Sequence, residues 1–205
     1  CFMKVKAKKS LGQHFLRNKA IAERIASSLL FAGENTKASA SEQRNVLEVG
    51  PGTGALTQFL IQREDINLKT VEIDRESVVY LSSNYPELSG RIINGDFLAL
   101  ELQGLFNDSF SVIGNFPYNI SSQIFFKILD YKDLIPEVVC MLQKEVAVRL
   151  SSQAGSRDSG ILSVLLQTWY NIEYLFTVDE NQFVPPPKVK SAVIRLTRNS
   201  REDLP

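Results

Sequence analysis

The feature that most constrains this fold is a regular alternation of short apolar runs with segments of helical spacing. The runs predict buried strands at residues 45–50, 68–74, 91–96, 109–115, 137–143, 171–178 and 191–197. Helical spacing predicts helices at residues 19–30, 55–64, 75–85, 122–131, 144–150 and 159–170. Strands that alternate with crossover helices predict an α/β fold with a mostly parallel sheet and helices on both faces.

Length and composition fit a single cytoplasmic domain. A chain of 205 residues that is 44% apolar can bury one large core, so we expect one domain over residues 1–205. The polar residues 31–44 predict a surface loop. No apolar run reaches the roughly 20 residues of a membrane span, and the basic N-terminus lacks the apolar block of a signal peptide. We therefore expect a soluble, cytoplasmic monomer that has no membrane contact.

Cysteine and histidine are too scarce to predict a metal site. The only cysteines are Cys1 and Cys140, and Cys140 lies within the apolar run "EVVCML". A buried thiol in a reducing compartment is therefore expected there instead of a disulfide or a metal ligand. The single histidine, His14, cannot anchor a zinc site alone.

Positive charge gathers near the two ends of the chain, although the formal net charge is zero. Residues 1–22 contain no acidic residue, and neither do residues 181–200. These segments would form one phosphate-facing surface if the fold joined them. A solvated tail and an ordinary exposed strand are the alternative, which the charge taken alone favours.

The stretch "LEVGPGTGAL" places Gly50, Gly52 and Gly54 in a turn between a strand and a helix. Glycines there permit positive φ angles and let a ligand approach the main chain. Glu72 ends the next strand, where its carboxylate would accept both hydroxyls of a ribose. The pattern also fits the dinucleotide fingerprint, so a nicotinamide and an adenosyl cofactor both remain open, and a tight turn without ligand is the third interpretation.

The third predicted strand ends in "INGDFL", with Asp96 followed by Phe97. This pair suits an adenine, because the carboxylate would accept from the exocyclic amine while an apolar neighbour covers the ring. A helix N-cap explains Asp96 equally well when it is taken alone. Together with the glycine loop and Glu72, however, the pair favours a nucleoside lying across the end of the sheet.

The fourth predicted strand runs into "GNFPYNISSQ". We infer a site that methylates the exocyclic amine of a base. The Asn115 side-chain oxygen and the Phe116 carbonyl would accept the two N–H groups, Pro117 would stiffen the turn, and Tyr118 would stack on the flipped base. A strand ended by polar residues is the alternative, and the surrounding pattern favours the functional interpretation.

The sequence resembles the ribosomal RNA adenine dimethyltransferases that modify the small subunit. The matching motifs are "KKSLGQHFL", "LEVGPGTGALT", "VEID", "NGDFL", "GNFPYNISS", "MLQKEVAVRL" and "FVPPPKVKSAVIRL". They span nearly the whole chain in the family's order. The resemblance implies a Rossmann-like class I methyltransferase fold with a seven-stranded sheet.

The resemblance also implies a reaction and a set of site residues. S-adenosylmethionine would donate methyl groups to two adjacent adenines near the 3′ end of small-subunit rRNA, leaving S-adenosylhomocysteine, in the course of subunit maturation. His14 and Leu16, within a basic arm at residues 1–18, would close over the cofactor. Phe183 would form a second aromatic wall opposite Tyr118. The remaining implied contacts are Gly50, Gly52, Gly54, Glu72, Ile73, Asp96, Phe97 and Asn115 for the cofactor, and Lys8, Lys9, Lys188 and Lys190 for RNA.

Two departures from the family pattern and three alternatives remain. Phe116 stands where leucine or isoleucine is common, and only its carbonyl is needed. The family's C-terminal helical domain is expected to be absent, because the chain stops at "TRNSREDLP". The alternatives are a large-subunit rRNA adenine methyltransferase that confers antibiotic resistance, an NAD-dependent oxidoreductase, and a non-catalytic assembly factor.

Overall fold

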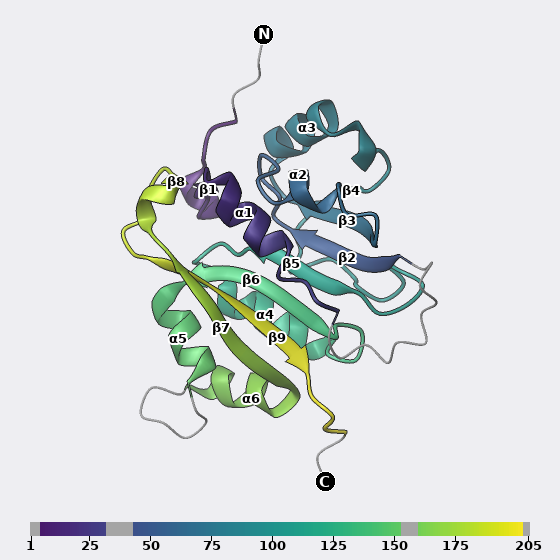
Figure 1. Cartoon of the computed structure of the whole chain (residues 1–205). Helices are drawn as coiled ribbons and strands as arrows, with labels where there is room; N and C mark the ends of the chain where they lie inside the picture. Colours follow the sequence, from purple (N-terminus) through teal and green to yellow (C-terminus); the bar gives the residue numbers. More distant parts are fainter. Residues whose placement is uncertain (1–4, 32–42, 153–159, 203–205) are drawn as a thin grey trace.

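A computed structural model describes residues 5–31, 43–152 and 160–202 (Figure 1). Most of the loop expected at residues 31–44 lies outside these ranges. None of the helices in the described ranges is long and apolar enough to cross a membrane.

The core of the fold is a seven-stranded sheet in the order β4-β3-β2-β5-β6-β9-β7. The first five strands in this order, from β4 through β3, β2 and β5 to β6, run parallel. Strand β9 runs antiparallel to both of its neighbours, β6 and β7. The mostly parallel sheet predicted from the sequence is therefore confirmed. Its strands are β2 (Arg44–Val49), β3 (Ile66–Glu72), β4 (Ile92–Asn94), β5 (Ser111–Asn115), β6 (Glu137–Gln143), β7 (Tyr170–Val178) and β9 (Ser191–Arg198).

Helices cover both faces of this sheet because successive strand residues point to opposite sides. In β2, Val46 belongs to the core cluster under α1 and α2, whereas Leu47 belongs to the cluster under α4, α5 and α6. Helix α3 packs against β3 and β4 (Figure 1). The helices are α1 (Lys19–Ala26), α2 (Thr57–Leu60), α3 (Arg75–Asn84), α4 (Ser121–Asp130), α5 (Lys144–Ser151) and α6 (Ile161–Trp169), with 3-10 turns η1 (Lys9–Leu11), η2 (Pro86–Leu88) and η3 (Glu180–Gln182).

Two helices are shorter than their apolar spacing predicts. Helix α1 ends at Ala26 because the chain beyond it is held by a carboxylate: the buried Glu137 accepts from the backbone N–H groups of Leu30 and Phe31 at 3.0 and 2.8 Å. Helix α2 has four residues, and Arg63 just beyond it donates to the Ala26 carbonyl at 2.9 Å. Tertiary bonds here outweigh local helix propensity.

A second, two-stranded sheet joins the two basic segments that lie near the ends of the sequence. Strand β1 (Phe15–Leu16) pairs antiparallel with β8 (Phe183–Val184), so that Leu16 lies opposite Phe183. Figure 1 shows the purple and yellow-green segments crossing one end of the large sheet. The two basic segments are therefore adjacent, as a joint basic surface requires.

Candidate active site

A cavity of about 230 Å³ lies at the carboxyl ends of β2, β3 and β5, beneath the N-terminal arm. In an open parallel sheet this is the edge where ligands bind. Its lining includes most of the residues predicted from the sequence: His14, Leu16, Gly50, Gly52, Glu72, Ile73, Asp96, Phe97, Asn115, Phe116, Pro117 and Tyr118. No cluster of His, Cys, Asp and Glu suited to a metal ion occurs in the described ranges.

The glycine loop has the left-handed backbone expected of it, but its glycines serve different purposes. Gly50, Gly52 and Gly54 have φ angles of 67°, 57° and 84°. A Cβ on Gly50 would meet no atom within 4 Å, which leaves this stretch of main chain open to a ligand. Gly54 is different, because a Cβ there would lie 2.4 Å from the Tyr85 ring and the residue is not part of the cavity lining. The structure therefore does not bring Gly54 into the cavity; its lack of a Cβ allows Tyr85 to pack.

Glu72 is held rigidly at the end of β3. Its two carboxylate oxygens accept from the backbone N–H groups of Gly52, at 2.9 Å, and Asp74, at 2.8 Å, and only 3% of the residue is exposed. Burial raises its pKa despite these two bonds. Each oxygen keeps a further lone pair, so the carboxylate can still accept ribose hydroxyls. Ile73, next to it, is exposed at the rim, where it can cover a ring.

Asp96 caps a turn and not a helix, since no helix follows it directly among the described residues. Its Oδ1 accepts from the Leu98 backbone N–H at 2.9 Å, as a cap would. Within the described ranges no group donates to Oδ2, and the residue lines the cavity beside the buried Phe97. An oriented acceptor with one free oxygen fits an adenine amine. The open Gly50 main chain, the fixed Glu72 and this free oxygen together fit an adenosyl cofactor.

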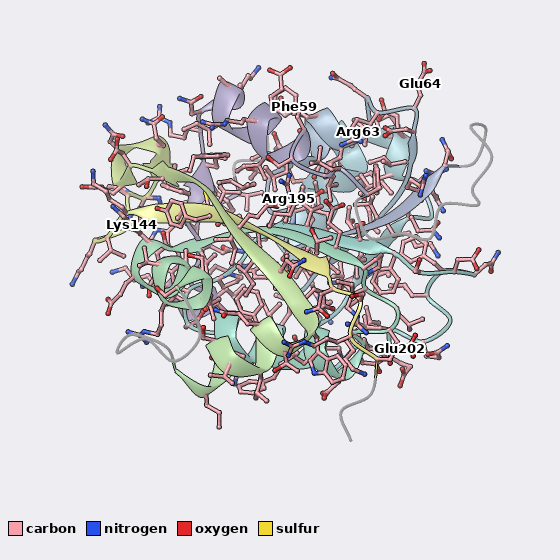
Figure 2. The ribbon with its side chains drawn as sticks, turned by 60° about the horizontal axis from the view of Figure 1, so that its bottom comes forward. Phe59, Arg63, Glu64, Lys144, Arg195 and Glu202 are labelled. Atoms are coloured by element: carbon pink, nitrogen blue, oxygen red, sulfur yellow. The ribbon has the colours of Figure 1, made fainter. Side chains whose placement is uncertain are left out.

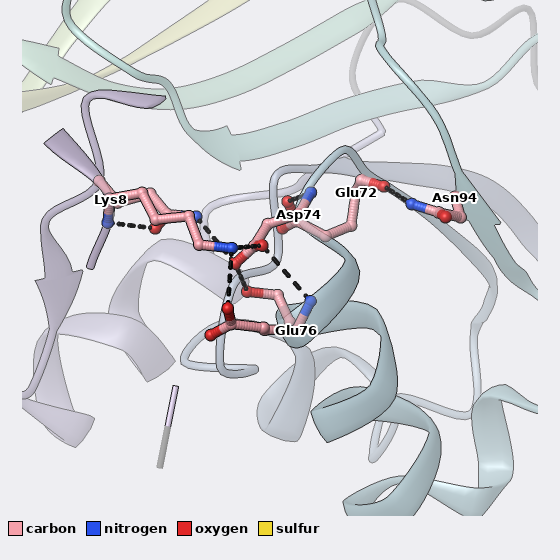
Figure 3. A network of polar contacts seen from close by, with 7 residues as sticks. Lys8, Glu72, Asp74, Glu76 and Asn94 are labelled. Carbon is pink, nitrogen blue, oxygen red and sulfur yellow. Dashed lines mark hydrogen bonds and ion pairs between the residues drawn. The ribbon is translucent and has the colours of Figure 1, made fainter. Parts of the chain in front are cut away.

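The N-terminal arm is fastened to the turn between β3 and α3 (Figure 3). Lys8 Nζ lies 2.5 Å from Asp74 Oδ1 and 3.2 Å from Glu76, and Gln13 donates to the other oxygen of Asp74 at 3.5 Å. Burial acts to raise the pKa of Asp74, but the bonds from Lys8, Ser77 and Gln13 outweigh it, and the pKa is lowered. Two carboxylates therefore engage the charge of Lys8, and its predicted contact with RNA stays a prediction.

Asn115 and Phe116 present two acceptors at the end of β5. Asn115 Nδ2 donates to the His14 carbonyl at 3.0 Å, which leaves its Oδ1 without a donor among the described residues. The Phe116 N–H donates to Met141 at 2.9 Å, while its buried ring packs edge-on against Phe125. The Phe116 carbonyl likewise receives no hydrogen bond from the described parts of the chain.

Tyr118 is fixed at both its hydroxyl and its ring. The hydroxyl lies 2.5 Å from Ser191 Oγ, at the start of β9. The His14 ring is stacked on it, with centroids 5.5 Å apart and an interplanar angle of 29°. His14 Nδ1 is in turn 2.8 Å from the Pro185 carbonyl. His14 therefore joins the N-terminal arm to the polyproline segment across the face of Tyr118.

Phe183 does not form the second aromatic wall in this structure. Pairing of β8 with β1 turns its side chain into the core beneath α1, where it is 2% exposed, and it does not line the cavity. The structure therefore does not bring Phe183 opposite Tyr118, and the His14 ring lies there instead.

Sequence reasoning missed several residues of the site. Ser191 anchors Tyr118, Gln13 helps hold the arm, and Glu48 lines the cavity while 1% exposed. Burial raises the pKa of Glu48 to about 8, although Thr57 donates to it at 2.7 Å. An acidic residue inside the apolar run "NVLEV" was the available signal for Glu48.

The four lysines predicted to contact RNA divide into two pairs. Lys8 and Lys190 form ion pairs, the latter with Asp179 at 2.6 Å. Lys9 and Lys188 are exposed and have no ion-pair partner in the described ranges. Lys9 and Lys188 therefore have the more available charges.

The sheet and its strand-end cavity define a Rossmann-like class I methyltransferase, and similar solved structures share this fold. The 23S rRNA methyltransferase ErmE aligns with a TM-score of 0.72 and 30% identity over 93% of this chain and 72% of its own. A dimethyladenosine transferase from Plasmodium falciparum aligns with a TM-score of 0.73 and 26% identity, over 91% of this chain and 64% of its own.

Within this class the sequence comparison is more specific. Residues 4–204 match the family described as ribosomal RNA adenine dimethylase, and the chain belongs to that family. It is 58% identical to ribosomal RNA small subunit methyltransferase A of Porphyromonas gingivalis, over 99% of this chain and 76% of the relative. The same-named protein of Parabacteroides distasonis is also 58% identical, over 98% of this chain and 71% of the relative. Family membership favours an adenosyl cofactor over a nicotinamide.

Proposed function

We propose that this chain transfers methyl groups from S-adenosylmethionine to the exocyclic amines of two adjacent adenines near the 3′ end of small-subunit rRNA. The observation that carries the proposal is the pair of unoccupied acceptors, Asn115 Oδ1 and the Phe116 carbonyl, beside the open main chain of Gly50. Relatives at 58% identity named for the small ribosomal subunit support the choice of RNA.

An adenine amine is a weak nucleophile because its lone pair is delocalised into the ring. Acceptors for both of its N–H groups pull the nitrogen towards tetrahedral geometry and stabilise the positive charge that develops on it. Asn115 and Phe116 provide these acceptors. The methylated, cationic amine loses its proton readily, so no strong base is required. When bound, S-adenosylmethionine supplies the electrophilic methyl group.

The cofactor lies, in this proposal, along the ends of β2 to β4. Glu72 would hold the ribose hydroxyls, the free oxygen of Asp96 would accept the adenine amine, and Ile73 and Phe97 would contact the ring. His14 and Leu16 close the cavity from the arm. Residues 1–205 act as the catalytic domain, as a monomer in the cytoplasm.

The test is methylation of small subunits purified from a strain that lacks the modification. We expect S-adenosylmethionine-dependent dimethyladenosine at two neighbouring positions near the 3′ end, located by mass spectrometry of the digested RNA. Methyl transfer to large-subunit rRNA instead would favour the resistance-type activity, for which the 30% identity with ErmE is the supporting observation. Binding to subunits without any methyl transfer would favour an assembly role.

A further inference from the structure

A basic groove lies outside the cavity described above, between the start of α5 and the segment that joins β8 to β9. Its volume is about 650 Å³. Figure 2 shows Lys144, the first residue of α5, at the edge of the molecule. Four cationic side chains line the groove, Lys144, Arg149, Lys188 and Lys190, against two carboxylates, Glu145 and Glu180.

Two of these four cations have no carboxylate partner. Arg149 pairs with Glu145 at 3.1 Å, and Lys190 pairs with Asp179 at 2.6 Å. Lys144 and Lys188 are exposed, and no carboxylate of the described residues lies within 4.0 Å of either ammonium group. Uncompensated positive charge on the two walls of one groove suits an anion that extends along it.

The groove adjoins the residue expected to stack on the target base. Lys144 N–H donates to the Lys190 carbonyl at 2.9 Å, which joins its two walls. The next residue, Ser191, bonds the Tyr118 hydroxyl at 2.5 Å. A nucleotide whose base reached Tyr118 would therefore have its neighbouring phosphates at the mouth of the groove.

We propose that this groove binds the sugar-phosphate backbone of single-stranded RNA next to the target adenine, with Lys144 and Lys188 as phosphate contacts. The inference rests on the proposed function and adds Lys144, on α5, to the RNA-binding surface. Bases that leave a duplex need a backbone path beside the pocket, and a basic groove is the usual form of such a path.

The experiment measures binding of the full chain to deproteinised, unmethylated small-subunit rRNA at several salt concentrations. The variants are Lys144→Ala, Lys188→Ala and the double variant. Arg91→Ala is the matched control, because Arg91 is exposed, has no ion-pair partner among the described residues, and precedes β4 at the opposite edge of the sheet. S-adenosylhomocysteine affinity, measured in parallel, reports whether each variant is folded.

For the double variant we expect roughly tenfold weaker RNA binding near 0.1 M salt and a log–log salt slope reduced by about 1.4, since each phosphate contact to a single strand contributes about 0.7. The KM for rRNA should rise while kcat at saturating rRNA stays within about twofold. Arg91→Ala should match the wild type, and every variant should retain its S-adenosylhomocysteine affinity.

Each other outcome has a definite meaning. If the wild type methylates rRNA but the double variant binds it with unchanged affinity and salt slope, the groove proposal is overturned and the proposed function stands. If the wild type neither binds rRNA nor methylates unmethylated small subunits, both fail. Displacement of the rRNA by poly-glutamate at an equal charge concentration would assign the groove to an acidic protein segment and would also overturn the proposal.

Discussion

We call the part of the cavity around Gly50, Glu72 and Asp96 its cofactor side, and the part around Asn115 and Tyr118 its base side. The bonds that hold these two sides span very different distances along the chain. Glu72 is fixed by bonds that span 2 and 20 residues, to Asp74 and Gly52. On the base side, Tyr118 reaches Ser191 across 73 residues, Asn115 reaches His14 across 101, and His14 reaches Pro185 across 171. The cofactor side is thus a local property of strand ends, whereas the base side depends on the assembled fold.

The largest expected effect comes from removing the acceptor on the base side. Asn115→Ala should lower kcat/KM for methyl transfer about 10²–10³-fold, as loss of one positioned polar group commonly does. Radiolabel transfer from S-adenosylmethionine to unmethylated subunits measures it. Asn171→Ala, an exposed asparagine in β7, is the control. Equal rates for Asn115→Ala and the wild type would contradict the mechanism.

The packing of the glycine loop against Tyr85 can be tested at Gly54. Gly54→Ala should destabilise the fold by about 2–3 kcal/mol, because it combines a positive φ with contact against the Tyr85 ring. Urea unfolding provides the measurement. Gly90→Ala is the matched control, since Gly90 has a φ of 73° and open space around its Cβ position. We expect the control to lose only about 1–2 kcal/mol, and an equal loss in both variants would show that Tyr85 packing contributes nothing.

The next prediction concerns pH and the buried carboxyl of Glu48. Its folded pKa of about 8 lies above the ordinary 4.5, so between these values the native state holds a proton that the unfolded chain has lost. Its contribution to stability is therefore present below about pH 4.5 and is lost as the pH rises through about 8, by at most about 1.4 kcal/mol per pH unit. Urea unfolding at pH 5 to 8 should show this loss in the wild type relative to Glu48→Gln. Parallel pH profiles for the two proteins would refute the prediction.

A smaller effect is expected from the anchor of Tyr118. Ser191→Ala leaves the tyrosine hydroxyl without its partner, at a cost of about 1 kcal/mol, so kcat/KM for rRNA should fall several-fold. S-adenosylhomocysteine affinity should not change, because Ser191 lies outside the cofactor side. Tyr118→Phe is the companion variant and should lose a similar factor. A large loss in one variant and none in the other would argue against the shared hydrogen bond.

The smallest effect is expected at the fastening of the arm. Lys8→Met removes the ion pairs with Asp74 and Glu76. Because Lys8 is partly exposed and the buried Asp74 keeps its bonds from Ser77 and Gln13, the Kd for S-adenosylhomocysteine should rise no more than about fivefold. High salt should reduce the difference from the wild type. Lys9→Met is the control, since Lys9 forms no ion pair within the described ranges. An identical Kd for Lys8→Met and Lys9→Met would show that the ion pairs of Lys8 do not hold the arm.

The sequence was informative where chemistry lies at the end of a strand. Strands of a parallel sheet share one carboxyl edge, so Gly50, Glu72, Asp96 and Asn115 could be placed together from their order alone. The same reasoning misplaced Gly54, because the packing of Tyr85 against the loop is a contact across the fold.

The errors elsewhere have a common physical cause. Strands β1 and β8 have two residues each, too few for any periodic signal, and their pairing determines that Phe183 is buried and that His14 faces Tyr118. Lys8 was assigned to RNA from the family resemblance, which gave no sign of its partners Asp74 and Glu76, more than sixty residues away. Contacts between distant short segments are the part of this site that the sequence did not disclose.

The position of β9 has a consequence for how the protein is made. This strand is the last one in the described residues, yet it inserts between β6 and β7 and carries the serine that holds Tyr118. A nascent chain cannot complete the sheet, or orient the aromatic ring of the base site, until Ser191–Arg198 has left the exit tunnel. The cofactor side, by contrast, is encoded in the first half of the chain, so translation delivers its residues well before the serine that orients the Tyr118 ring.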